Sequence, residues 1–378
     1  RIFDHRSDLH LIRTAGETNF TATQLITRTP AALQGAALAL TLTHPLCPTA
    51  EVPLAWPSVI RQRVRNDYPL LAVQEIGATS VRVPWTDIED TLQRKRLQYL
   101  RAEGIAVQAF VPFDDALDLH HLLDHYPDCA DRWEVQTTGE PMPDTTCLNL
   151  LADCSRRTPL SLSTIVPGER IAGKQHSRTR LGFRLQELAT LNELLTDRAL
   201  ILDSALCRID AEDDPWTTVQ RFRTLPRLSH IRRIDWLLTL PSRDDKAHAR
   251  LAAEALFATA LLPDAQLYVD PILDLDRTMD IANGVLDRLC NPRPIFHALR
   301  CLNTLLYAHR KTWVPEEREE KGVRILALRS EEHVLELLLP EEPVRWTSAS
   351  KRIYDLPGGT VAVDTDKVLI AGPSLVYT

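Results

Sequence analysis

Several features that many proteins share are scarce or missing in this chain of 378 residues. Aromatic residues make up 6% of it, and glycine occurs 13 times. No apolar run reaches the roughly 18 residues that a membrane-spanning helix needs, so no membrane span is expected. The formal net charge is −7, whereas a general nucleic-acid binder usually has a basic excess, so nucleic acid is not expected as a partner.

The seven cysteines are odd in number and include no Cys-x-x-Cys pair, which argues against a zinc site. Most of them lie beside apolar residues, a pattern typical of buried, reduced thiols. Reduced thiols favour the cytoplasm, whereas a leader removed ahead of Arg1 would make the periplasm the destination. Nothing in the sequence indicates a metal or another cofactor.

Between residues 80 and 310 the chain alternates seven times between a short apolar stretch and a segment with helical spacing. AVQAFVP, for example, is the continuous apolar run of a strand that is buried on both faces. If ALALTLTHPL and the helix after it supply a first unit, the count is eight, which predicts a closed (β/α)8 TIM barrel. An open doubly wound sheet is the alternative, but no glycine-rich phosphate loop follows any of the strands.

After residue 313 the pattern changes to short strands separated by Pro, Gly and Asp, such as VRILALRS and GTVAVDT. About 60 residues are few for an independent core, so the mostly extended N-terminal segment is expected to complete this antiparallel β-sandwich. The expected organisation is an N-terminal segment, 1–50, that joins the β-sandwich, a barrel over 51–312, and the β-sandwich over 313–378.

The stretch NGVLDRLCNPRPIFHALRCL, Asn283 to Leu302, resembles the end of (β/α)8 glycoside hydrolases whose two catalytic Glu residues end strands 4 and 7. Such barrels often close with Gly-Leu-x-Asp-x-x-Gly-x-Pro-Lys-Pro-x-Tyr-x-Ala-Leu before a small β-sandwich. GATSVRVPW is similar to the second strand of this clan, and the terminal IAGPSLVYT to the last strand of the sandwich. The resemblance implies a glycosidase-like barrel that handles a polysaccharide, similar to barrels encoded with bacterial exopolysaccharide machinery.

In this clan strand 4 often runs Trp-x-aliphatic-x-Asn-Glu-Pro, and its Glu is the proton donor. Here the stretch is RWEVQTTGEP, so the position of the acid falls on Thr138, and Glu140 comes two residues late. Glu140 can serve as acid/base only if a bulge or a shifted turn brings it back over the barrel mouth. The alternative is a solvated turn residue. Glu134, near the start of the strand, is expected to lie deep in the barrel.

Strand 7 of the family ends in Thr-Glu, and here the strand is RIDWLLTLPS, with Leu240 where the resemblance places the nucleophile. Leucine can neither attack an anomeric carbon nor stabilise an oxocarbenium ion, so a conventional retaining mechanism is not expected. An inverting pair could combine Glu140 with an Asp on strand 8, YVDPILDLD, where Asp274 is a candidate for the mouth.

Candidate binding residues lie where strands end, because the βα loops build the site of such a barrel. Trp85 ends the second strand and could offer an aromatic face to a sugar ring. After strand 5, PGERIAGKQHSRTR is a locally basic loop in an acidic chain. Its residues His176, Arg178 and Arg180 are candidates for holding an anionic group, with a solvated loop as the alternative.

Three interpretations are compatible with these observations. In the first, a glycosidase-like barrel binds a carbohydrate, such as an anionic glycan, or a protein partner, and is a pseudoenzyme because the strand-7 nucleophile is missing. In the second, the chain is a divergent O-glycosyl hydrolase that acts on a polysaccharide with Glu140 as acid/base. An unrelated barrel enzyme is the third reading, and a metal at the strand ends would favour it.

Overall fold

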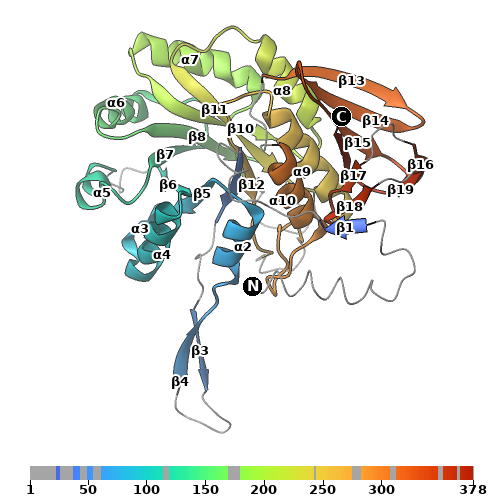
Figure 1. The fold of residues 1–378 in the computed structure, drawn as a ribbon. Coiled ribbons are helices and arrows are strands. Elements are labelled where there is room, and N and C mark those ends of the chain that lie inside the picture. Colours follow the sequence, from blue (N-terminus) through green and yellow to red (C-terminus); the bar gives the residue numbers. More distant parts are fainter. Residues whose placement is uncertain are drawn as a thin grey trace.

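The computed structural model describes residues 23–25, 37–42, 49–53, 61–113, 119–168, 179–241, 244–274, 282–306, 312–347, 352–363 and 367–377. Eight parallel strands pair into a closed ring (Figure 1). In ring order they are β2 (Leu38–Thr41), β5 (Ser80–Pro84), β6 (Ala106–Pro112), β7 (Arg132–Thr138), β8 (Leu160–Pro167), β10 (Leu202–Ile209), β11 (Ile231–Thr239) and β12 (Leu267–Asp270). Because β8 pairs with β10 and β12 pairs with β2, the ring has no open edge, and the predicted (β/α)8 barrel is confirmed.

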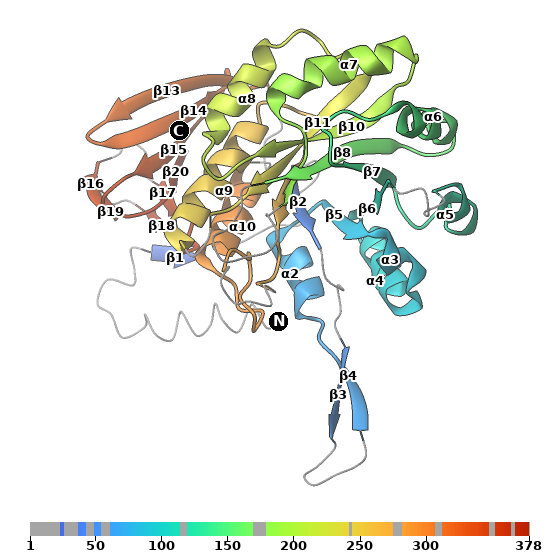
Figure 2. The same ribbon diagram turned by 180° about the vertical axis from the view of Figure 1, so that it is seen from behind.

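Helices connect the barrel strands and cover the outside of the ring (Figures 1 and 2). They are α2 (Tyr68–Ile76), α3 (Trp85–Glu89), α4 (Thr91–Ala102), α5 (Leu119–His125), α6 (Thr145–Cys154), the short 3-10 helix η3 (Leu185–Glu187), α7 (Leu188–Asp197), α8 (Pro215–Thr224), α9 (Asp245–Thr259) and α10 (Pro294–Leu306). None of the described helices is long and apolar enough to cross a membrane.

The stretch that carries the resemblance forms the loop before α10 and the helix itself. Gly284 is required there, because a Cβ at this position would lie 2.5 Å from the backbone nitrogen of Asp274. Pro294 occupies the first turn of α10, where its missing N–H has no helical partner to lose. Phe296 and Leu299 follow at helical spacing, and both are buried.

The C-terminal region is an antiparallel sheet of seven strands, and its first strand in sheet order comes from the N-terminal segment. The order is β1 (Thr23–Leu25), β18 (Thr360–Val363), β17 (Arg352–Asp355), β20 (Ser374–Tyr377), β15 (Val334–Pro340), β14 (Val323–Arg329) and β13 (Val314–Glu320). A two-stranded sheet of β16 (Val344–Trp346) and β19 (Val368–Ile370) shares a small apolar core with it, which includes Ile325, Trp346 and Ile353. The sheet of the sandwich thus uses the N-terminal segment, as predicted.

The first barrel strand, β2, lies in the stretch ALALTLTHPL, which the sequence analysis considered as the first barrel unit, although the expected domain boundary placed all of 1–50 with the β-sandwich. Its alternating apolar and Thr residues suggested a half-buried strand, but all four residues of β2 are buried. The barrel interior on one side and the helix layer on the other cover them. The hairpin of β3 (Thr49–Pro53) and β4 (Arg61–Arg65) follows and projects away from the barrel in both views (Figures 1 and 2).

The barrel and the seven-stranded sheet share one continuous apolar core. Leu326 and Leu337 of the sheet belong to the same buried cluster as Leu256 of α9 and Leu302 of α10. Salt bridges at its margin add to this contact, because Arg324 of β14 lies 2.9 Å from Glu254 of α9 and 2.7 Å from Asp214, which caps α8. The two regions therefore pack as one body.

Candidate functional site

Alternate residues of the barrel strands point into the ring, and most of those residues are polar. The apolar part of the interior is a small cluster of Ala39, Leu206, Leu237 and Tyr268, separate from the main core between strands and helices. The buried polar residues on these strands that make contacts inside the ring are Ser80, Arg82, Gln108, Glu134, Gln136, Ser161, Ser163, Ser204 and Asp235. Such an interior requires every polar group to be paired.

Glu134 of β7 is the centre of the hydrogen-bond network, and its side chain is 0% exposed. Arg82 donates to both of its oxygens, at 2.6 and 2.7 Å. Gln108 donates to Oε2 at 2.6 Å, and Ser163 and Gln136 donate to Oε1 at 2.5 and 3.1 Å. Both carboxylate oxygens of Glu134 thus accept hydrogen bonds, from β5, β6 and β8 as well as from β7 itself.

Two opposing effects set the pKa of Glu134. Burial alone would raise the pKa, but the Arg82 guanidinium and the hydrogen bonds from Arg82, Ser163 and Gln108 outweigh it, so the pKa lies below its ordinary value. The carboxyl is therefore ionised at neutral pH and has no proton to donate. Its depth in the barrel agrees with the sequence-based expectation.

A second layer of the network lies nearer the N-terminal ends of the strands. Arg132 of β7 lies 2.9 Å from Asp235 of β11 and 2.7 Å from Asp203 of β10. It also donates to Oε1 of Gln108, which receives a second hydrogen bond from the Tyr268 hydroxyl at 3.1 Å. These bonds link five strands across the ring, which fills and rigidifies the bottom of the barrel.

Towards the C-terminal mouth, Asp270 ends β12 and is half-buried. Desolvation raises the pKa of its carboxyl to about 6, against the opposing effect of Arg82. The Arg82 guanidinium lies over the ring of Phe110, 4.4 Å from the ring centroid, in a cation–π contact below the mouth. Asp270 thus holds a proton more readily than an ordinary aspartate.

The inward-facing positions at the ends of β7 and β11 belong to threonines. Thr138 continues the alternation of Glu134 and Gln136, and Thr239 continues that of Asp235 and Leu237. Both threonines are exposed, as expected at a barrel mouth.

Leu240 has the opposite orientation to the one that the sequence analysis gave it. It is 4% exposed and belongs to the main core, together with Trp236 and Leu238 of the same strand. It therefore faces the helices, and Thr239 takes the mouth position of this strand. Because successive side chains of a strand point to opposite faces, a motif that is aligned one residue off assigns every side chain to the wrong face.

Glu140 lies in an exposed turn after β7. Its backbone carbonyl accepts a 3.0 Å hydrogen bond from the Thr164 hydroxyl of β8, which fixes the turn against the neighbouring strand. Trp85 begins α3 directly after β5, and it is half-buried against the main core. Both residues follow C-terminal strand ends, so they lie on the same side of the barrel.

The basic loop after β8 lies mostly outside the described residues, including His176 and Arg178. Arg180 is described, in β9 (Thr179–Leu181), which pairs with the end of β8. Its guanidinium lies 3.1 Å from Asp210 and 3.1 Å from Glu212. Asp210 is also 3.2 Å from Arg208, so carboxylates and guanidinium groups alternate at this rim.

Asp274 is buried beside the loop that precedes α10. Its carboxylate forms an ion pair with Arg293, which also lies 2.8 Å from Asp245, and it accepts a hydrogen bond from the backbone N–H of Gly284. These partners hold the segment after β12 against the closing loop. The structure thus brings Asp274 together with Arg293 rather than with Glu140.

Sequence reasoning missed Arg82 and Asp270 as members of the interior. A signal was present, because Arg82 interrupts the apolar strand SVRVP and Gln108 interrupts AVQAFVP. Arg or Gln inside a run that reads as buried points to the interior of a barrel that pairs polar groups. Among the described residues no group of His, Cys, Asp and Glu is arranged to hold a metal ion.

Comparisons with known proteins support no family assignment. No protein-family model matches the chain, and no curated protein matches it. Solved structures that it resembles include a family-30 endoxylanase from Clostridium papyrosolvens, at 10% identity over 94% of this chain and 99% of that one, with a TM-score of 0.45. A family-30 xylanase from Clostridium acetobutylicum gives 12% identity over 94% and 97%, with a TM-score of 0.45. A maltogenic α-amylase from Thermotoga neapolitana gives 9% over 90% and 98%, with a TM-score of 0.43.

Proposed function

We propose that the chain is a glycosidase-like barrel that binds a polysaccharide at its C-terminal mouth without cleaving it. The observation that supports this most is the pair of threonines, Thr138 and Thr239, at the inward-facing ends of β7 and β11. A retaining glycosidase of the clan in question needs its two carboxyl groups at the ends of these strands, about 5–5.5 Å apart. Threonine hydroxyls can hydrogen-bond a sugar, but they supply neither the acid nor the nucleophile.

Glu134 does not take over the missing role in this proposal. Arg82, Gln108, Ser163 and Gln136 occupy both of its oxygens, and its lowered pKa keeps it ionised. A general acid must hold a proton at the working pH, and a nucleophile needs an oxygen free to approach the sugar. Glu134 therefore acts as a structural anchor below the sugar.

The binding residues in this proposal are Trp85, which offers an aromatic surface at the end of β5, and the loop of His176, Arg178 and Arg180. Guanidinium groups form charge-assisted hydrogen bonds to carboxylates, so an acidic polysaccharide is the favoured ligand. Arg180 already contacts Asp210 and Glu212, and it would share its guanidinium with the sugar acid. Binding of this kind weakens with salt, because exposed charges are screened over about 10 Å at 0.1 M.

The test measures binding and cleavage on the same samples. The protein is incubated with acidic and neutral bacterial polysaccharides, binding is followed by affinity electrophoresis, and cleavage by the release of reducing ends. We expect binding of the acidic polymer without new reducing ends. Trp85→Ala should weaken binding roughly tenfold, because aromatic stacking contributes strongly to such contacts.

One control variant and a second variant of the proposed site keep this result specific. Tyr99→Ala removes an exposed aromatic from the outer helix α4 and should leave binding unchanged. Arg178→Ala/Arg180→Ala should remove most of the salt-sensitive part of the affinity. Equal binding by wild type and both site variants would overturn the proposed site.

The second candidate function is hydrolysis, and Asp270 is the observation that favours it. Its half-buried carboxyl has a pKa raised to about 6, as a general acid requires. Glu140 lies at the same end of the barrel and would then be the general base that activates water in an inverting pair, in place of the acid/base role that the sequence suggested. Reducing ends that disappear in both Asp270→Asn and Glu140→Gln would establish this function in place of the first.

A further inference from the structure

The opposite end of the barrel carries a concentration of positive charge that the proposed function does not use. From Pro215 to Ile234 the sequence contains no acidic residue, although the chain as a whole has a net charge of −7. This stretch covers α8, the loop after it and the start of β11. Its five arginines are Arg221, Arg223, Arg227, Arg232 and Arg233.

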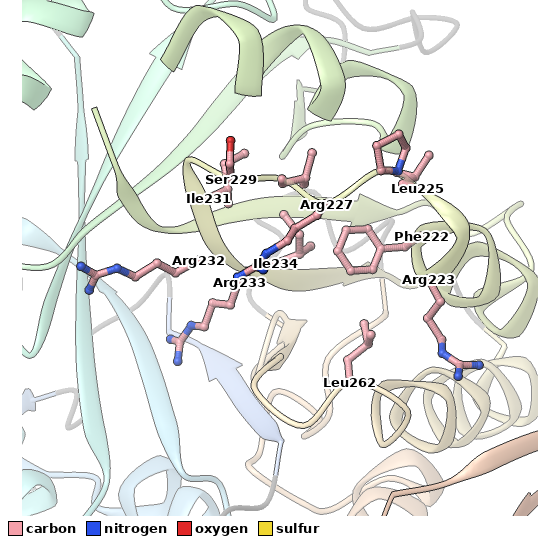
Figure 3. A pocket seen from close by; sticks show the side chains of 12 residues that line it. Phe222, Arg223, Leu225, Arg227, Ser229, Ile231, Arg232, Arg233, Ile234 and Leu262 are labelled. Atoms are coloured by element: carbon pink, nitrogen blue, oxygen red, sulfur yellow. The ribbon is translucent and has the colours of Figure 1, made fainter. Parts of the chain in front are cut away.

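A pocket of about 700 Å³ lies in this region, between the end of α8, the start of β11 and the segment after α9 (Figure 3). Arg223, Arg227, Arg232 and Arg233 line it together with apolar side chains that include Phe222 and Leu262. Cavities of roughly 300–1,000 Å³ with a few polar groups are typical of small-molecule sites.

The apolar side of the pocket is fixed by packing. The ring of Phe222 meets the ring of the buried Trp236 edge to face, with 5.6 Å between the ring centroids. In Figure 3 the side chains of Arg227, Arg232 and Arg233 lie on one side of Phe222, and Arg223 lies on the other. A ligand in the pocket would thus contact an apolar wall flanked by arginines on both sides of Phe222.

Most of these arginines lack an acidic partner. Arg233 lies 3.3 Å from Asp235, but Asp235 also pairs with Arg132. Arg223 donates to the neutral amide of Gln220 at 3.0 Å. No carboxylate in the described part of the chain forms an ion pair with Arg223, Arg227 or Arg232.

Part of the positive charge has a structural explanation. Arg221 and Arg223 belong to the last turn of α8, where cations interact favourably with the helix dipole. Arg227 and Arg232 lie outside the helix, so the helix dipole does not explain their positions. These two residues are therefore the informative ones for a test.

We propose that this pocket binds a small anion that carries two or more phosphate or carboxylate groups. Guanidinium groups recognise both kinds of group through paired, charge-assisted hydrogen bonds, and the separate arginines provide room for more than one. The site lies at the N-terminal end of the barrel, so the proposal does not depend on polysaccharide binding at the mouth.

The test is isothermal titration calorimetry of the full chain with pyrophosphate, citrate and inorganic phosphate at low salt. We expect pyrophosphate or citrate to bind more tightly than phosphate, and the tighter of the two identifies the preferred acidic group. Arg227→Gln/Arg232→Gln should weaken that binding by roughly tenfold or more, since each charge-assisted hydrogen bond contributes appreciably.

The matched control is Arg156→Gln/Arg345→Gln. It removes the same two charges from exposed positions that do not line the pocket. Affinity that falls equally in both double variants would show only a general charge effect and would overturn the proposal. Equal binding by wild type and Arg227→Gln/Arg232→Gln, or no binding of any of the three anions below about 1 mM, would overturn it as well.

Discussion

The barrel interior and the arginine pocket are both rich in charge, but their charges are paired differently. Inside the ring, Arg82 and Glu134 contact each other through two hydrogen bonds, and Glu134 has three further donors. In the pocket, Arg227 and Arg232 have no carboxylate partner among the described residues. Burial differs in the same sense, because the Arg82 side chain is 1% exposed whereas Arg227 and Arg232 are exposed.

The paired charges inside the barrel stabilise the fold, whereas the pocket arginines without an ion pair among the described residues are available to a ligand. A buried ion costs several kcal/mol unless partners surround it, so the Arg82–Glu134 pair persists only because it is saturated. Exposed guanidinium groups keep their hydration and need no partner for folding. The same contrast predicts where substitutions should change stability and where they should change binding instead.

The largest expected effect follows removal of one partner of the buried pair. Glu134→Ala leaves the Arg82 guanidinium buried without its carboxylate, and it should lower the free energy of unfolding by about 3–5 kcal/mol. Urea denaturation followed by circular dichroism measures this. Arg82→Met/Glu134→Leu removes both charges and should be less destabilising than Glu134→Ala. If the double variant is instead less stable than Glu134→Ala, the attraction within the buried pair exceeds the cost of burying its charges, and the pair adds net stability to the fold.

A smaller effect is expected at Asp87 of α3, a buried carboxyl group with no cation paired to it among the described residues. Its Oδ2 has no hydrogen-bond partner among the described residues, and desolvation, with a contribution from Asp90, raises its pKa from 3.8 to about 7. The folded state thus binds a proton that the unfolded state releases, so stability falls as pH rises from about 4 to about 7. Asp87→Asn should therefore be more stable than wild type at pH 8, by about 1–3 kcal/mol.

The same variant should gain much less at pH 5, where the wild-type carboxyl is protonated in the folded state. Denaturation at both pH values measures the change. A gain that is equal at pH 5 and pH 8 would mean that the substitution acts through packing rather than through this ionisation.

Arg180 is an intermediate case, with a side chain that is 22% exposed and two carboxylate partners. Arg180→Gln should lower the free energy of unfolding by about 0.5–1 kcal/mol, because Asp210 retains Arg208 and partly exposed ion pairs contribute little. Thermal denaturation in low and high salt measures it. A loss that persists unchanged at high salt would point to packing of the arginine stem as the cause.

The sequence was sufficient for the architecture, since continuous apolar runs alternating with helical spacing follow directly from burial on both sides of a barrel strand. The sequence was insufficient where the same residue pattern is compatible with either a helix or a strand. The stretch from Arg61 to Gly77 has helical spacing throughout, but its first five residues form β4, and only Tyr68–Ile76 is helical. Gly77 ends that helix in a left-handed conformation with φ 78°.

The candidate site was harder to predict than the fold, because it depends on the orientation of single side chains. A motif places Leu240 at the mouth, but the alternation of β11 turns it towards the helices. The partners of Asp274 lie 10 and 19 residues further along the chain, outside any local pattern, so the sequence did not indicate its ion pair with Arg293. The interior of the ring was similarly hidden, because Arg82, Glu134 and Ser163 lie on three strands that only the closed barrel brings together.

The smallest expected effect concerns Glu140, which the sequence analysis selected as the acid/base candidate. Its side chain is exposed in a turn, and the turn is held by the backbone carbonyl, which accepts from Thr164 and does not need the carboxylate. Glu140→Gln should therefore change the free energy of unfolding by less than about 0.5 kcal/mol, as surface substitutions usually do. If the chain only binds its polysaccharide, binding should also be unchanged. If Glu140 is the proton donor, the amide instead abolishes protonation of the leaving oxygen, and hydrolysis of acidic or neutral bacterial polysaccharides should fall by orders of magnitude. Reducing-end release by wild type that is lost in this variant would show a working catalytic strand, although Thr138 and Thr239 hold the mouth positions.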